Sequence, residues 1–198
     1  MIVHIVDDDE AIRDSLRWLF ASRGVTAVLW PSGEAFLEAW HPALDGCILL
    51  DMRMTGITGG DVFAELRRRG AVQPVIFLTG HGDIALAVEC LKLGAVDFIE
   101  KPFNSNDLVD RVLAALSRAK AQRDMVAARE RLHAARAQLS PRESEVMEMM
   151  VAGLQNKEIA DRLSITIRTV EVHRARVLDK MQARNAVDLA RMIARFGD

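Results

Sequence analysis

The chain has 198 residues, of which 50% are hydrophobic and 27% charged, and its formal net charge is −2. This length allows one large domain or two small ones, each with an apolar core. No apolar run approaches the roughly 20 residues of a bilayer-spanning helix, and the N-terminal apolar run is too short for a secretory signal. An integral membrane protein is therefore excluded, and we expect a cytoplasmic protein without a membrane partner. Cys47 and Cys90 lie in apolar surroundings without metal-type spacing, so we expect buried, reduced thiols.

The charge is distributed unevenly along the chain. Residues 1–116 contain 10 Lys and Arg against 17 Asp and Glu, whereas residues 117–198 contain 16 against 11. An acidic half followed by a basic half suggests two domains with different partners. The basic half is compatible with nucleic-acid binding, although this excess alone is a weak indication.

Strand and helix patterns alternate through the acidic half. Short apolar runs predict strands at residues 2–6, 25–29, 47–51, 75–78 and 96–99, and helical apolar spacing follows each of them. Ser105 is expected to cap the last of these helices. Five such units predict an α/β fold, a doubly wound five-stranded parallel sheet of the flavodoxin type with strand order 2-1-3-4-5.

The composition changes after residue 116. Ala, Arg, Gln and Glu dominate there and Gly and Pro are absent as far as residue 138. Such a segment favours a helix but buries little. We therefore expect three parts, a first domain at 1–118, a helical linker at 119–137 and a second, smaller domain at 138–198.

The second domain is predicted to be all-α. Ser140 offers an N-cap before Pro141, with Glu143 at the third helical position. Further helices are expected at residues 156–163, 167–181 and 186–195, with turn residues between them.

Polar side chains follow four of the predicted strands. Asp7 and Asp8 follow the first strand, Asp51 ends the third, Thr79 ends the fourth and Lys101 follows the fifth. In the order 2-1-3-4-5 the crevice opens at the carboxyl ends of strands one and three, so these groups should converge. Three neighbouring carboxylates repel one another unless a cation lies among them, and their oxygens suit Mg²⁺.

This predicted cluster has the chemistry of a phosphoryl-transfer site. Asp51 can act as the nucleophile and become an aspartyl phosphate. Because the transition state is loose, catalysis would come from positioning and from neutralising the phosphoryl oxygens, here by Mg²⁺ and Lys101. Taken singly, Asp51 reads as a strand-end turn residue and Lys101 as a surface lysine. We expect Asp9 and Glu10 to be solvated, helix-capping acids.

Residues 156–181 show a short helix, a tight turn and a longer helix, which is the helix-turn-helix pattern. On the second helix Val170, Val177 and Leu178 are expected to pack inward. The candidate DNA contacts are Asn156, Lys157, Arg168, Thr169, Glu171, Val172, His173, Arg174, Ala175, Arg176 and Lys180. Glu171, Val172 and Ala175 are candidates for reaching base edges, whereas Thr and Arg at a helix end suit phosphates. An ordinary helical bundle with a charged solvent face would have the same spacing.

Residues 1–116 resemble the receiver domain of two-component response regulators. The matching segments are Val6-Asp7-Asp8, Asp51-Met52-Arg53-Met54, Thr79-Gly80-His81 and Phe98-Ile99-Glu100-Lys101-Pro102-Phe103. One departure is Thr55, where the family usually has proline before Gly56.

The resemblance implies roles for these residues. Asp51 would accept a phosphoryl group from a sensor histidine kinase. The implied Mg²⁺ ligands are Asp7, Asp8, Asp51 and the backbone carbonyl of Arg53. Thr79 and Lys101 would bind the phosphoryl group, and Phe98 would follow Thr79 inward as a switch.

The basic half resembles the four-helix output domain shared by LuxR and NarL regulators. The matching segments are Leu139-Ser140-Pro141-Arg142-Glu143-Ser144-Glu145-Val146, Gly153-Leu154-Gln155-Asn156-Lys157-Glu158-Ile159-Ala160 and Thr169-Val170-Glu171-Val172-His173-Arg174. With Gly80-His81-Gly82-Asp83 and the segment around Lys101, the chain is most similar to the FixJ-like subfamily.

This second resemblance implies a transcription regulator that binds double-stranded promoter DNA. When phosphorylated it would form a homodimer through the face made by the fourth helix and fifth strand. We expect it to act with RNA polymerase as an activator. The last helix pairs output domains in that family, so Leu189, Met192 and Ile193 are either interface or core residues.

Two other functions use similar parts. An aspartyl-phosphate hydrolase also places an Asp at the end of a parallel strand, but it needs a second acid two residues later, where this chain has Arg53. A receiver that works only through protein contacts would have a helical adaptor as its basic half. We expect neither, and predict a regulator whose receiver catalyses only its own phosphorylation and dephosphorylation.

Overall fold

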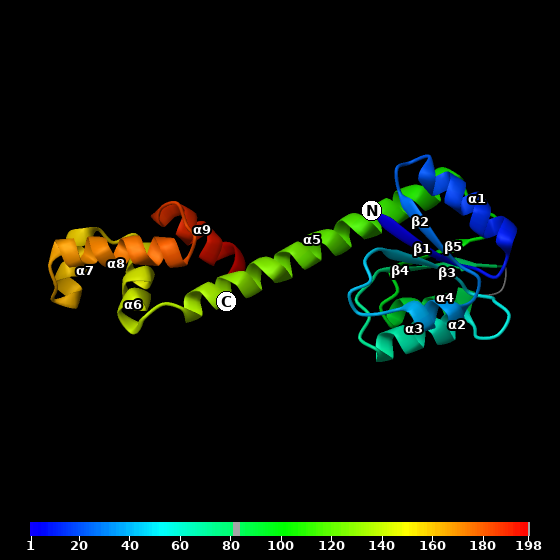
Figure 1. The fold of residues 1–198 in the computed structure, drawn as a ribbon, viewed down its shortest axis with the longest axis horizontal. Coiled ribbons are helices and arrows are strands. Elements are labelled where there is room, and N and C mark those ends of the chain that lie inside the picture. The colour runs from blue at the N-terminus through cyan, green and yellow to red at the C-terminus, as the bar shows by residue number, and fades with distance from the viewer. Residues whose placement is uncertain (81–83, 198) are drawn as a thin grey trace. The chain divides into compact units, whose positions relative to one another are not determined.

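The computed structural model describes residues 1–80 and 84–197 and divides the chain into two compact units (Figure 1). The N-terminal unit is Met1–Lys120 and the C-terminal unit is Ala121–Asp198. The motif residues His81, Gly82 and Asp83 lie outside the described residues. Within the described part of the chain, no helix has both the length and the apolar character needed to cross a membrane.

The N-terminal unit is built on an all-parallel five-stranded sheet with the order β2-β1-β3-β4-β5, as the alternating pattern predicts. Its strands are β1 (Ile2–Val6), β2 (Thr26–Trp30), β3 (Cys47–Asp51), β4 (Val75–Thr79) and β5 (Asp97–Glu100). Its helices are α1 (Glu10–Ala21), α2 (Gly33–Ala39), α3 (Gly59–Arg68), α4 (Ile84–Lys92) and the first part of α5 (Ser105–Ala137). The strand β2 lies one residue later than expected, because Thr26 pairs with Ile2 and Trp30 with Val6.

Both faces of this sheet are buried. α1 and α5 contribute Leu16 and Val109 to one apolar cluster, which includes Leu49 of β3. α2, α3 and α4 lie together on the other side (Figure 1), where the rings of Phe63 and Phe77 meet edge to face at 5.5 Å. Successive side chains of a strand point to opposite faces. Burial on both sides therefore explains why β3 and β4 are unbroken apolar runs. Both cysteines are free and buried, as expected.

Short polar side chains define where the helices begin. Asp9 accepts hydrogen bonds from two first-turn amides of α1, which is the capping role expected for it. α5 begins at Ser105 itself, and the residue that caps it is Asn104, whose side chain accepts from the amides of Asn106 and Asp107. Asn and Ser satisfy the same unpaired amides, so composition alone did not distinguish between the two positions.

The C-terminal unit is all-α and has its own core. It contains α6 (Pro141–Val151), α7 (Asn156–Leu163), α8 (Ile167–Lys180), α9 (Ala186–Phe196) and the end of α5. Val146, Val170 and Leu189 are fully buried there, and Leu132 of α5 is 4% exposed. Most of the segment 119–137 is exposed, as expected of a segment that buries little, and Leu132 is its one buried residue.

Candidate phosphoryl-transfer site and nucleic-acid interface

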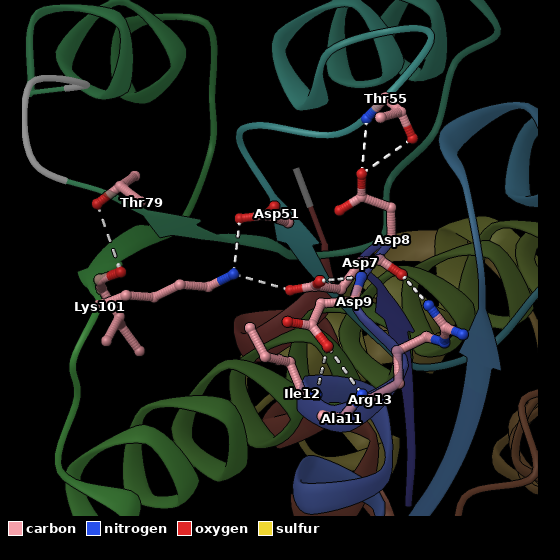
Figure 2. A network of polar contacts seen from close by, with 11 residues as sticks. Asp7, Asp8, Asp9, Ala11, Ile12, Arg13, Asp51, Thr55, Thr79 and Lys101 are labelled. Carbon is pink, nitrogen blue, oxygen red and sulfur yellow. Dashed lines mark hydrogen bonds and ion pairs between the residues drawn. The ribbon is translucent and has the colours of Figure 1, made fainter.

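The parallel sheet delivers polar groups to one of its edges. Asp7 and Asp8 directly follow β1, Asp51 is the last residue of β3, and Lys101 directly follows β5. β1 and β3 are neighbours, so their carboxyl ends meet at the same edge. Figure 2 shows the four side chains gathered there. The structure thus brings together the three carboxylates and the ammonium group that the sequence analysis selected.

The ammonium group of Lys101 bridges two of the carboxylates. Its Nζ donates to Oδ2 of Asp7 at 2.8 Å and to Oδ1 of Asp51 at 2.9 Å. The Asp7 side chain is 1% exposed and that of Asp51 9%, so both ion pairs are shielded from water. Charge-assisted hydrogen bonds of this length are among the stronger ones in proteins.

The remaining bonds of the acidic residues hold them in place. Oδ1 of Asp7 accepts from the amide of Asp9 at 2.9 Å, and its carbonyl accepts from the Arg13 guanidinium at 2.7 Å. Oδ2 of Asp8 accepts from both the amide and the hydroxyl of Thr55, at 2.8 and 3.0 Å. Neither of these roles for Arg13 and Thr55 was predicted from the sequence, since residue spacing does not determine the direction of either side chain.

The electrostatics of the cluster show an excess of negative charge. Burial raises the pKa of Asp51, and the charges of Asp7 and Asp8 raise it further against the opposing effect of Lys101. Burial lowers the pKa of Lys101, but its hydrogen bonds to Asp7 and Asp51 more than compensate, so the net shift is upward. The backbone hydrogen bond from Thr55 lowers the pKa of Asp8. A divalent cation would relieve the repulsion among the three acids.

The donor set fits Mg²⁺. One oxygen from each of Asp7, Asp8 and Asp51 can be chosen so that all lie within 4.8 Å of one another. Neighbouring and opposite ligands of an octahedral Mg²⁺ lie about 3 and 4 Å apart, so small side-chain adjustments suffice. Arg53 is exposed and lies two residues after Asp51, on the loop that follows β3.

The two expected switch residues are Thr79, the last residue of β4, and Phe98 in β5. Thr79 is 1% exposed and donates its hydroxyl to the carbonyl of Ile99 at 3.4 Å (Figure 2). Phe98 is half-buried and packs against the apolar cluster under α2, α3 and α4. The backbone amide of Lys101 donates to the Thr79 carbonyl at 2.7 Å, which links the ends of β4 and β5.

The C-terminal unit contains a helix-turn-helix. Ser164 is the C-cap of α7 and has a φ of 51°, in the left-handed region, and Thr166 caps α8 by accepting from the amide of Thr169 at 3.1 Å. Val170 and Val177 are fully buried and Leu178 is partly buried, so α8 turns its apolar side inward as expected.

The candidate DNA contacts divide by exposure. The exposed ones are Lys157, Arg168, Glu171, Val172, Ala175 and Arg176, and the half-buried ones are Asn156, Thr169, His173, Arg174 and Lys180. Lys180 donates to Oε2 of Glu143 at 2.6 Å and to the Gln138 carbonyl at 3.0 Å. Glu143 is 3% exposed. Because separating a buried ion pair is costly, the geometry favours a structural role for Lys180 over a DNA contact.

The last helix contributes to the core of its own unit. Leu189 is fully buried, while Met192 and Ile193 are partly buried against the same cluster. Of the two alternatives for these residues, Leu189 is a core residue in this structure.

A doubly wound domain with an acidic phosphoryl-transfer edge, followed by a helix-turn-helix domain, defines a two-component response regulator that controls transcription. The chain belongs to the response regulator family: residues 3–113 match the Response regulator receiver domain, and residues 137–193 match the Bacterial regulatory proteins, luxR family.

Individual relatives resemble the chain over nearly its whole length. It is 55% identical over 192 residues to the C4-dicarboxylate transport transcriptional regulatory protein DctR of Rhodobacter capsulatus, covering 96% of this chain and 98% of that protein. It is 47% identical over 190 residues to the transcriptional regulatory protein FixJ of Azorhizobium caulinodans, covering 96% and 90%. The crystal structure of full-length FixJ from B. japonicum matches with a TM-score of 0.63 and 42% identity, covering 99% and 97%.

Family membership establishes the general function. The chain is a DNA-binding transcription regulator and not a metabolic enzyme. Receiver domains bind Mg²⁺ through clustered acidic residues, and Asp7, Asp8 and Asp51 form such a cluster here. The receiver domain implies a histidine kinase as a partner, and the luxR-type domain implies DNA.

Proposed function

We propose that Asp51 accepts a phosphoryl group from a sensor histidine kinase, and that this step converts the chain into a DNA-binding homodimer. In the transfer, the N–P bond of the kinase phosphohistidine breaks, a bond forms between phosphorus and a carboxylate oxygen of Asp51, and the released imidazole takes up a proton. The observation that carries this assignment is Lys101, whose ammonium group lies 2.9 Å from Asp51 and 2.8 Å from Asp7. An ammonium group there can neutralise the oxygens of a phosphoryl group on Asp51.

The Mg²⁺ ligands in this proposal are Asp7, Asp8, Asp51 and the backbone carbonyl of Arg53. The bound ion would supply positive charge to the phosphoryl oxygens. Asp7 is suited to its share of the work because Asp9 and Arg13 fix its position through two further hydrogen bonds. Asp7 and Thr79 are both almost completely buried, so bulk water has little access to these two side chains.

Phosphorylation then shifts the population between two arrangements of the receiver. The Thr79 hydroxyl bond to Ile99 is long at 3.4 Å, so it is readily exchanged for a phosphoryl oxygen. Phe98 is only half-buried and can follow Thr79 inward. The face made by α4 and β5 changes as a result, and two phosphorylated chains pair there.

The paired output domains bind a two-fold promoter site, since a symmetric dimer presents two recognition helices. The exposed residues of α8, including Arg168, Glu171 and Val172, are suited to meet the duplex. The complex then acts on RNA polymerase as an activator, in the cytoplasm. In this scheme residues 1–118 receive the signal, residues 119–137 connect the domains and residues 138–198 read DNA.

Labelling with acetyl phosphate and Mg²⁺ tests the acceptor. The full chain is expected to become phosphorylated, Asp51→Asn is expected to stay unlabelled, and Glu10→Gln, in the neighbouring acidic run, is expected to label normally. Mass spectrometry reads the result. Persistent labelling of Asp51→Asn would place the acceptor elsewhere.

A gel shift with and without acetyl phosphate tests DNA binding. Phosphorylated protein is expected to shift promoter fragments, and Arg174→Ala is expected to weaken binding to all sequences and to reduce the salt slope by about 1. Arg184→Ala is the matched control, because its side chain is 89% exposed and lies after α8. An unchanged slope in Arg174→Ala would argue against a phosphate contact, and no shift under either condition would favour the adaptor alternative.

A further inference from the structure

Thr55 makes two hydrogen bonds to a carboxylate of the cluster. Its amide N–H donates to Oδ2 of Asp8 at 2.8 Å, and its hydroxyl donates to the same oxygen at 3.0 Å. This is the position where the receiver resemblance leads one to expect proline. Proline has neither an N–H nor a hydroxyl, so it could form neither bond.

The loop that carries Thr55 is fixed independently at both of its ends. The amide of Gly59 donates to the Met52 carbonyl at 3.1 Å, and the amide of Ile57 donates to Oε1 of Glu34 at 3.0 Å. The Thr55 bonds therefore do more than close the loop, since they tie its middle to the acidic cluster. Arg53, whose carbonyl is a proposed metal ligand, is two residues from this tie.

The two donors bind the same oxygen and leave the other one available. Figure 2 shows the second oxygen of Asp8 directed toward Asp51, on the side away from Thr55. Mg²⁺ in proteins takes single carboxylate oxygens and retains several waters. A carboxylate with one oxygen held by the protein and the other facing the site is therefore oriented for such an ion.

The orientation of the Asp8 carboxylate depends on these two hydrogen bonds more than that of Asp7 or Asp51 does. Lys101 donates to Asp7 and Asp51, whereas Thr55 supplies the hydrogen bonds that reach the Asp8 carboxylate from another of the described residues. Asp8 is also only half-buried, so repulsion from the other two acids would favour rotation of its side chain toward solvent.

We propose that Thr55 is a positioning residue for the metal site, which holds Asp8 in the orientation that binds Mg²⁺. This inference rests on the proposed Mg²⁺ site. Mutation of a residue that hydrogen-bonds a metal ligand typically lowers metal affinity by about 10- to 100-fold. Thr55 would therefore set the Mg²⁺ concentration at which this receiver becomes competent for phosphorylation.

Calorimetric titration of the full-length chain with Mg²⁺, without any phosphodonor, tests the proposal. Thr55→Ser retains both donors and should bind within twofold of the original chain. Thr55→Val retains only the N–H and should bind about 3- to 10-fold more weakly, and Thr55→Pro about 10- to 100-fold more weakly.

Glu34→Ala separates positioning of Asp8 from general ordering of the loop. It removes the bond to Ile57 without touching Asp8, and its Mg²⁺ affinity should change less than twofold. Equal affinity in Thr55→Val and the original chain, tighter binding in Thr55→Val, or an equally large loss in Glu34→Ala would overturn the role of Thr55 while leaving the metal site intact. Failure of the original chain to bind Mg²⁺ would instead reject the metal site, and the inference with it.

Discussion

Neutralising Asp51 is expected to stabilise the receiver when Mg²⁺ is removed. Asp51→Asn keeps the size of the side chain but removes one of three negative charges that share one ammonium group. The substitution eliminates two repulsions and weakens one attraction, and the balance between them decides the sign. The upward pKa shift of Asp51 points the same way, because a carboxyl group with a raised pKa in the folded state disfavours folding once it is ionised.

The magnitude follows from the distances. With an effective dielectric constant of about 20, each acid within 4.8 Å of Asp51 repels it by at least about 3.5 kcal/mol, and two acids by about 7 kcal/mol. Lys101 at 2.9 Å attracts Asp51 by about 6 kcal/mol on the same scale. The difference is a net stabilisation of about 1 kcal/mol, to which relief of the buried charge adds. For a unit of this size we expect a rise of about 3 to 8 °C in the midpoint of thermal unfolding.

Tryptophan fluorescence can follow this transition in the intact chain. All three tryptophans, Trp18, Trp30 and Trp40, lie in the N-terminal unit, and the chain has no tyrosine. The thermal midpoint should be higher for Asp51→Asn than for the original chain in EDTA, and the gap should close in excess Mg²⁺, because only the chain with all its ligands gains the full binding energy.

The matched control for this experiment is Asp110→Asn, an exposed carboxylate of the same unit, which should shift the midpoint little under either condition. A lower midpoint for Asp51→Asn in EDTA would show that the attraction of Lys101 outweighs the repulsion and would refute this account of the electrostatics.

Three further predictions concern other parts of the chain. Gly59→Ala should destabilise the receiver by about 2 kcal/mol, because a Cβ there would lie 2.2 Å from the backbone carbonyl oxygen of Asp51. Gly60→Ala is the control, since a Cβ there meets nothing closer than 3.7 Å, and it should be neutral or stabilising. Urea unfolding followed by tryptophan fluorescence compares the two variants, and equal effects would contradict the steric reasoning. The ion pair and capping bonds of Glu143 lower its pKa to about 2, so they stabilise the C-terminal unit fully above pH about 4.5, and this stability should fall as the pH drops toward 2. Unfolding followed by far-ultraviolet circular dichroism should show that the stability of Glu143→Gln depends less on pH in this range. The same pH dependence in both proteins would count against the ion pair. Burial lowers the pKa of His4, whose Nδ1 accepts from the indole N–H of Trp30 at 3.2 Å. The receiver should therefore lose stability as the pH falls below about 6.5, because His4 must then be protonated. Unfolding midpoints measured against pH should show a smaller loss in His4→Gln, and an identical pH dependence would exclude His4 as its source.

The arrangement of the acidic edge was accessible from the sequence. A parallel sheet brings the carboxyl ends of its strands together, so the positions of Asp7, Asp51 and Lys101 at strand ends were enough to predict their convergence. The residues that hydrogen-bond these groups could not be predicted from the sequence. Thr55 and Arg13 lie on a loop and a helix whose side-chain directions depend on packing, which no periodicity encodes.

The same limit applies in the basic half. The capping pattern of Ser140 and Glu143 was predicted and is present, because its partners are three residues apart. The ion pair between Glu143 and Lys180 spans 37 positions, so Lys180 read as one more cation on an exposed helix. Leu132 is a similar case, because a single leucine in an Ala- and Arg-rich segment does not reveal the core into which it packs.

The ion pair of Lys180 has a consequence for operator length. Val177 and Met181 are buried, Asp179 is an exposed acid and Lys180 is bound to Glu143, so the last exposed basic residue of α8 is Arg176. From Arg168 to Arg176 the helix advances about 12 Å, which is the height of about three to four stacked base pairs. In the proposed dimer, each half-site of the promoter should therefore be specified at only about four base pairs. Discrimination across a genome would then depend on the spacing of two such half-sites. Inserting one base pair between them should therefore lower the DNA-binding affinity more than changing one base pair within either half-site.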